Sequence, residues 1–204
     1  MLMMPMLWRH FFYHIGHISR GVFHMFLLRT SWCDDIGNSR AAFLFALILN
    51  MLAVPLGAWF SFFDPKNADL TLQARLIIEA IVLMVTLISI FLMALCRGRM
   101  HKFPIVYAGV TYSGMMIALI LAAVQGLGLL YDQSLYGQTA PNLAHGPAHL
   151  LLVGAVVWMI VLTSFVFKTA LKIGVAASVM MTAILFFILT SGRYILGILW
   201  LHYF

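Results

Sequence analysis

The chain has 204 residues, of which 64% are hydrophobic and 9% are charged, and its formal net charge is +6 at pH 7. Soluble domains contain about 25% charged and about 45–50% apolar residues, so this composition excludes an ordinary soluble globule and a disordered chain. It predicts an integral membrane protein in which basic residues between apolar runs set the topology. Because no basic patch carries interleaved aromatic residues, we expect no nucleic-acid partner.

The first predicted element is an amphipathic helix over Pro5–Leu28. Four histidines of this segment fall within an arc of about 80° on a helical wheel, and Arg20 borders that arc. The opposite side is bulky and apolar, so we expect the helix to lie in the membrane interface with its polar face toward lipid headgroups. The candidate lipid-facing residues are His10, His14, His17, Arg20 and His24.

Three interpretations fit this histidine face. In the first, neutral imidazole groups lie in the headgroup zone. In the second, imidazole groups that gain a proton bind anionic lipid in a pH-dependent way. Alternatively, His10 and His14 have the i,i+4 spacing that can chelate a metal or haem from one helix face. No carboxylate or thiolate joins them within the helix, so we predict neither a metal site nor a cofactor.

A polar linker, Thr30–Arg40, follows this helix. Trp32 is the type of residue that anchors a chain at the membrane interface. Asp34 and Asp35 are adjacent, so in a helix they would not face each other. Since no histidine spacing supports a paired acid and base, we predict no catalytic residue here.

Five apolar runs are each long enough to cross a bilayer core, which needs roughly 20 helical residues. They are Arg40–Phe63, Leu76–Cys96, Phe103 to about Tyr131, His149–Phe167, and Ile173 to at least Gly192. The predicted fold class is therefore an all-α polytopic membrane helix bundle. Residues 1–39 form the N-terminal amphipathic interfacial helix and its cytoplasmic linker, and residues 40–204 form a domain of five transmembrane helices.

Ionisable and polar residues inside membrane spans are candidates for function. Glu79 and Arg193 have matching predicted depths in the second and fifth spans, so we expect an intramembrane ion pair between their helices. Asn50 can hydrogen-bond a neighbouring helix. In an alternative interpretation, Asn50, Tyr112, Gln125 and Glu79 line a water-accessible path.

The distribution of cations predicts the orientation. The N-terminal segment and the connections after the second and fourth spans carry nine Lys and Arg residues, against three on the other side. The positive-inside rule then places the N-terminus in the cytoplasm and the C-terminus outside, and we expect a bacterial inner membrane. Cys33 and Cys96 both lie on the cytoplasmic side, where thiols normally stay reduced.

The stretch Leu27–Asn50, LLRTSWCDDIGNSRAAFLFALILN, resembles the entry into the first span of bacterial Yip1-type small membrane proteins. The layout of a cytoplasmic amphipathic segment, five spans and a short outer tail is similar to theirs over most of the chain. The Asp-Leu-Tyr-Gly-Pro signature of the eukaryotic members is missing. The resemblance implies a non-enzymatic membrane organiser that works through partners, and it implies no catalytic residues.

The functional prediction is a non-enzymatic accessory or scaffold subunit of a larger inner-membrane assembly. Short connections, an uncharged tail and the absence of nucleotide-binding, hydrolase or metalloprotease motifs favour it. Its partners would be membrane lipids and other integral membrane subunits. The alternatives are a small transporter or channel component, and a membrane redox subunit that binds haem, quinone or metal through histidines.

Overall fold

The computed structural model describes the backbone of residues 3–36, 39–60, 71–135 and 145–203. Side chains are described for residues 13–36, 40–55, 71–120, 150 and 153–200. The part of the chain that is described is all-helical, with seven α-helices, one short 3-10 helix and no strand. The all-α class predicted from the sequence is confirmed.

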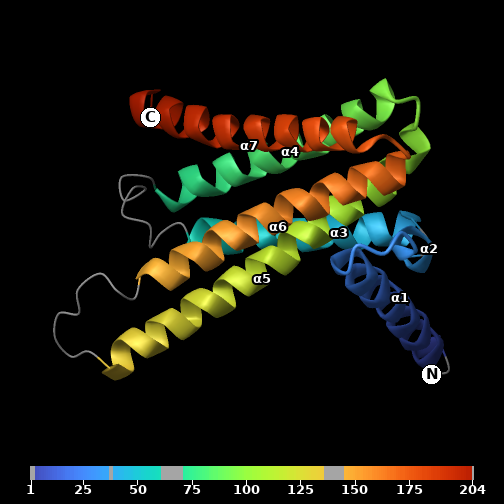
Figure 1. Cartoon of the computed structure of the whole chain (residues 1–204), viewed down its shortest axis with the longest axis horizontal. Coiled ribbons are helices and arrows are strands. Elements are labelled where there is room, and N and C mark those ends of the chain that lie inside the picture. Colours follow the sequence, from blue (N-terminus) through green and yellow to red (C-terminus); the bar gives the residue numbers. More distant parts are fainter. Residues whose placement is uncertain (1–2, 37–38, 61–70, 136–144, 204) are drawn as a thin grey trace.

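Five long helices run up and down through one bundle (Figure 1). They are α3 (Ser39–Phe60), α4 (Leu72–Cys96), α5 (Phe103–Leu135), α6 (His145–Leu171) and α7 (Val175–Tyr203). Helix α5 is the central element, since it packs against α3, α4 and α6, whereas α7 packs against α4 and α6. Helix α4 also packs against α3, and Figure 1 shows α4 and α7 together on one side of the bundle, which is called its edge here.

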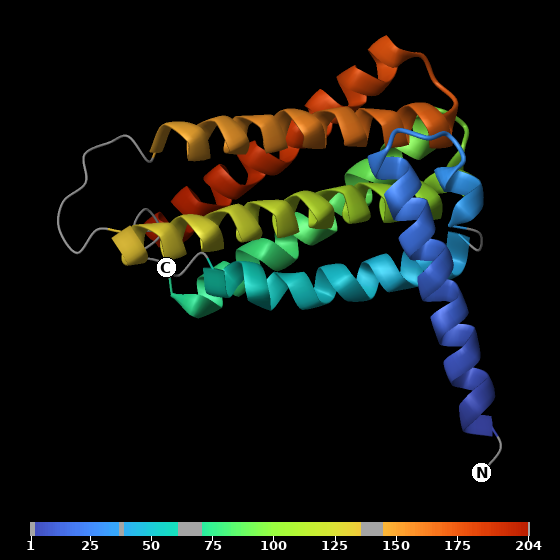
Figure 2. The same cartoon turned by 60° about the horizontal axis from the view of Figure 1, so that its bottom comes forward.

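Two further helices cover one end of the bundle. Helix α1 (Met3–Phe26) runs across this end rather than along the long helices (Figure 2). It packs against α5 and α6 of the bundle and against the one-turn helix α2 (Trp32–Asp35). The 3-10 helix η3 (Met100–Lys102) makes the turn from α4 to α5 at the same end, and the α6–α7 turn lies there too. The C-terminus lies at the opposite end.

Four stretches are long and apolar enough to cross a membrane, which makes the chain an integral membrane protein. They are Leu72–Cys96, Met100–Ile120, Val153–Leu171 and Val175–Trp200. The apolar stretch of α3, Arg40–Pro55, is shorter. The predicted first span reached Phe63, and its last three residues fall outside the described residues. The described stretches therefore give four spans by this criterion, where the sequence predicted five.

Helices α4 and α6 begin before the predicted apolar runs, and α5, α6 and α7 continue past the predicted ends. Helix α4 begins at Leu72, four residues before the predicted Leu76, because the Thr71 hydroxyl accepts a hydrogen bond from the Ala74 amide at 3.2 Å and caps the helix. At its C-terminal end, helix α7 continues to Tyr203, well past the predicted minimum of Gly192. Hydropathy marks the apolar middle of a span, while capping decides where the helix begins.

Candidate functional site at the basic end of the bundle

The one-turn helix α2 is fixed to the bundle by Trp32. Its side chain is fully buried, and the indole Nε1 donates a hydrogen bond to the Thr169 hydroxyl of α6 at 2.8 Å. The ring lies over Gly109 of α5, where an added Cβ would meet the ring atom Cη2 at 2.8 Å. Trp32 was predicted to be an interfacial anchor, and this is wrong because the glycine leaves room for the indole inside the protein.

Helix α1 packs onto α2 through a second glycine. The chain turns at Leu28, whose φ of 54° is left-handed, and the Arg29 amide closes the turn on the His24 carbonyl at 2.8 Å. This turn folds α2 back against Gly21. A Cβ on Gly21 would lie 3.1 Å from the Ile36 nitrogen and 3.2 Å from the Trp32 oxygen. Only glycine allows the two backbones to approach so closely.

Asp35 is the centre of a polar cluster between α1 and α2. Its carboxylate accepts a hydrogen bond from His24 Nδ1 at 2.5 Å, and Arg20 Nε lies 3.8 Å from its other oxygen. The His17 Nδ1 donates to the Asp35 backbone oxygen at 3.1 Å. The hydrogen bond from His24 lowers the pKa of Asp35, and the charges of His24 and Arg20 act in the same direction.

Three of the five predicted lipid-facing residues therefore have protein partners: His17, Arg20 and His24 all reach α2. His14 is half-buried, and the side chain of His10 lies outside the described residues. The expectation that Asp35 has no histidine partner is wrong. Its distance of 11 residues from His24 is bridged by the turn at Leu28, and helical periodicity cannot show such a fold-back.

A cleft of about 860 Å³ opens beside α2. Its basic residues come from two separate turns: Lys102 ends η3, and Lys168 and Lys172 lie at the end of α6. The other lining residues are Thr30, Cys33, Asp34, His101, Ile105, Thr169, Ala170 and Ile173. In the sequence these lysines contributed only to the topology count, so the cleft is a feature that sequence reasoning missed.

The three lysines of the cleft have no salt bridge among the side chains that the structure describes. Asp34 is the one carboxylate in the lining. With His101 neutral, the lining residues carry a net charge of +2, from three lysines and one aspartate. The cleft is thus suited to an anion.

Cys33 lines the same cleft, but its thiol is not activated. Burial raises the pKa of Cys33 to about 11, and this effect outweighs the opposing hydrogen bond with Thr169. Cysteine reacts as its thiolate, and a raised pKa keeps the neutral thiol at physiological pH. The chemistry of the cleft is therefore that of binding rather than of thiolate nucleophilic attack.

A second polar group lies inside the bundle. The Asn50 amide donates to Tyr107 Oη at 2.7 Å and to Thr111 Oγ1 at 2.8 Å, which joins α3 to α5. Tyr112 Oη donates to the Ala42 carbonyl at 2.9 Å. Two residues of the alternative transport path, Asn50 and Tyr112, are thus bonded within the protein. The side chain of Gln125 lies outside the described residues.

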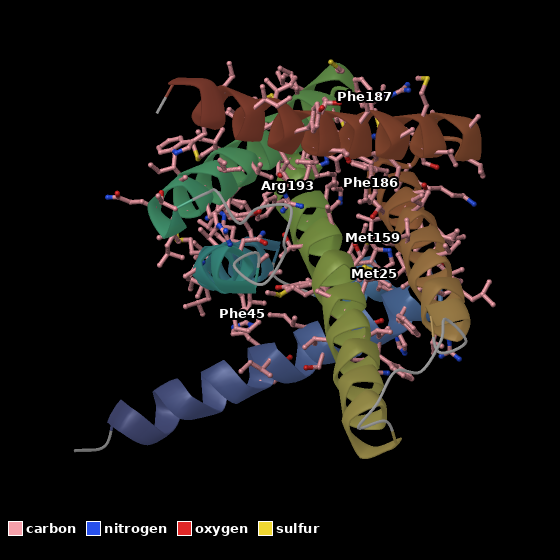
Figure 3. The ribbon with its side chains drawn as sticks, turned by 90° about the vertical axis from the view of Figure 1, so that its left-hand side faces the viewer. Met25, Phe45, Met159, Phe186, Phe187 and Arg193 are labelled. Atoms are coloured by element: carbon pink, nitrogen blue, oxygen red, sulfur yellow. The ribbon has the colours of Figure 1, made fainter. Side chains whose placement is uncertain are left out.

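Glu79 of α4 and Arg193 of α7 form an ion pair near the other end. Arg193 Nη2 donates to Glu79 Oε2 at 2.8 Å, which joins the two helices of the bundle edge. Figure 3 shows Arg193 on the side of α7 that faces the bundle. The Arg193 side chain is 57% exposed and that of Glu79 is 23% exposed. The pair links α4 to α7, which otherwise meet through a small apolar cluster around Ile78 and Val82.

Among the described side chains, no group of three or more His, Cys, Asp or Glu residues could hold a metal ion. No known protein family, curated protein or solved structure matches this chain. The resemblance of its layout to Yip1-type proteins therefore stays a prediction.

Proposed function

We propose that this protein is a non-enzymatic accessory or scaffold subunit of a larger bacterial inner-membrane assembly. The observation that carries the proposal is the uneven burial of its helices. Half of the apolar stretch Met100–Ile120 in α5 is buried within the chain, against 17% of Leu72–Cys96 in α4 and 22% of Val175–Trp200 in α7. The edge formed by α4 and α7 is therefore available to lipids and to partner subunits.

The outer side of α7 suits a partner helix. Met180, Ile184 and Phe187 are spaced so that they share one helix face, and their exposed fractions are 57%, 44% and 71%. Figure 3 shows Phe187 on the side of α7 that is turned away from the bundle. Helices in lipid associate by van der Waals packing of complementary faces, and large side chains on one stripe supply such a face.

In this proposal α3 completes a set of five spans, and α1 lies in the interface on the cytoplasmic side. The basic connections that predict this orientation meet at one end of the bundle, because the α4–α5 and α6–α7 turns both lie beside α1 and α2. That arrangement supports a cytoplasmic N-terminus and an outer C-terminus. A role as a membrane organiser, as the Yip1-type layout implies, fits the same picture.

The hydrogen bonds inside the bundle favour this function over transport. Asn50 uses its amide to join α3 to α5, and Tyr112 uses its hydroxyl to bind the α3 backbone. Polar groups that satisfy each other in this way hold helices together in lipid. They support a packing role for the residues that the transport alternative would need.

A photo-crosslinking amino acid at Phe187 tests the proposal in native membranes. The matched control is Leu119 of α5, whose exposed fraction of 68% is close to the 71% of Phe187. We expect Phe187 to crosslink to another integral membrane protein of discrete mass and Leu119 to give lipid adducts. Lipid adducts alone at Phe187, together with a lone chain after extraction in mild detergent, would overturn the proposal.

The orientation is tested separately with C-terminal reporter fusions. An outer C-terminus makes an alkaline phosphatase fusion active and leaves a fusion to green fluorescent protein dark. The exposed Cys96 gives the control, since a membrane-impermeant maleimide should label it in inverted vesicles and not in intact cells. The opposite labelling pattern would reverse the proposed topology.

A further inference from the structure

We propose that the cleft lined by Lys102, Lys168 and Lys172 is a binding site for a phosphate group, supplied by the headgroup of an anionic lipid or by a soluble phosphate compound. This proposal goes beyond the accessory function and does not depend on it. The site is built where the α4–α5 and α6–α7 turns meet beside α2.

Three lysines from two separate turns line the cleft. Lys168 and Lys172 are four residues apart at the end of α6, and the third lysine comes from a different turn. Cations near the C-terminus of a helix are ordinarily favourable because they complement its dipole, which accounts for Lys168. That explanation does not extend to Lys102, which lines the same cleft from η3. An anion bound between the turns would offset the repulsion among the three.

The backbone at Lys172 also points to a ligand. Its φ of 50° is left-handed, a conformation that glycine adopts freely and that is unfavourable for residues with a Cβ atom. Glycine would end α6 at least as well, since the Ile173 amide closes the helix on the Lys168 carbonyl at 3.2 Å. A lysine at this position costs stability, and Lys172 lines the cleft.

The size and lining of the cleft suit a phosphate-bearing molecule. A volume of about 860 Å³ falls in the range of small-molecule sites and exceeds the needs of a single ion. Ile105 and Ile173 add an apolar wall beside the lysines. A phosphate oxygen accepts charge-assisted hydrogen bonds from ammonium groups, while the apolar wall suits the glycerol and the first acyl carbons of a lipid.

The test uses the purified full chain in mild detergent and measures bound lipid by native mass spectrometry. The lipid probe is phosphatidylglycerol, with phosphatidylcholine as the neutral comparison, and the soluble probes are inorganic phosphate and glycerol phosphate. We expect phosphatidylglycerol to bind preferentially and to raise Tm. Each of Lys102→Gln and Lys172→Gly should weaken that binding roughly tenfold.

Two variants separate lost binding from lost folding. Lys172→Gly removes the charge while relieving the left-handed lysine, so its Tm without lipid should be equal to or higher than that of the native chain. Arg97→Gln removes one exposed cation from the same end without touching the cleft, and it should leave phosphatidylglycerol binding within about twofold, because an exposed charge contributes little.

The outcomes also distinguish the two sources of phosphate. Binding of phosphatidylglycerol that millimolar glycerol phosphate does not displace assigns the site to a lipid headgroup, whereas equal competition assigns it to a soluble phosphate compound. Binding that falls equally in Arg97→Gln and Lys172→Gly reflects the general charge of this end and overturns the site. Failure of every probe to bind also overturns it and leaves the crosslinking result at Phe187 unaffected.

Discussion

The two ends of the bundle each hold an acid beside a base, but the packing around the two pairs differs. At the basic end, Asp35 contacts His24 and Arg20, and its helix is fixed by the fully buried Trp32. At the other end, Glu79 and Arg193 join two edge helices, and Arg193 remains 57% exposed. The difference shows that an acid–base contact holds helices together more firmly where close packing surrounds it.

Trp32→Ala is expected to have the largest effect, because it removes the residue that holds α2 to the bundle. Truncating a fully buried tryptophan typically costs about 3–5 kcal/mol, and this one also loses its hydrogen bond to Thr169. Thermal unfolding in mild detergent measures the loss. Trp32→Phe keeps most of the ring contact and should cost less. Equal and small losses in both variants would show that α2 is not fixed by packing.

Gly21→Ala is expected to have the next largest effect, a loss of about 1–3 kcal/mol. The added methyl group meets backbone atoms of Ile36 and Trp32, which cannot move as a flexible side chain would. Gly16→Ala in the same helix is the matched control, since nothing lies within 4 Å of its added Cβ. That control should be neutral or stabilising, because alanine favours a helix. Amide exchange across α1 and α2 should be faster in Gly21→Ala than in Gly16→Ala. Equal exchange in both variants would contradict the close approach of the α1 and α2 backbones at Gly21.

Charge changes at the opposite end should have a smaller effect. Glu79→Gln is expected to cost about 1 kcal/mol, because polar contacts between membrane helices contribute on this scale and the long Arg193 side chain can extend toward the nearby interface. The single variants Glu79→Arg and Arg193→Glu place like charges together, and the double exchange should restore most of the native Tm. No recovery in the double variant would show that the pair does not form in the membrane-embedded protein.

The smallest expected effect is the pH response of Asp35. Its pKa is lowered in the folded protein, so its contribution is fully present above the ordinary aspartate pKa of about 3.9 and is lost as the pH falls through the lower folded value. Amide exchange in α2, expressed relative to the intrinsic exchange rate at each pH, should therefore rise only in acid, below about pH 4. Asp35→Asn removes the titrating group and should abolish that rise. A rise that persists in this variant would assign the response to other groups.

Helix type and approximate position could be predicted from the sequence, because lipid imposes requirements that each segment meets by itself. A span must be long, apolar and internally hydrogen-bonded, so hydropathy alone locates α4, α5 and α6 within a few residues of both ends. It locates the start of α7 equally well, but the helix continues far past the predicted Gly192. The matching depths of Glu79 and Arg193 in their spans were enough to predict an ion pair. Their charged atoms lie 2.8 Å apart although the two residues are 114 positions apart in the sequence.

Tertiary structure alone decided what surrounds the basic end. The partner of Asp35, the burial of Trp32 over Gly109, and the meeting of Lys102 with Lys168 all depend on how separate turns approach one another. Helical periodicity predicts which residues share one face of one helix, and it does not predict contacts between segments that are distant in sequence. From the sequence, these lysines could be assigned only to one side of the membrane. They line one cleft because the α4–α5 turn, the α6–α7 turn and α2 pack together at the same end of the bundle.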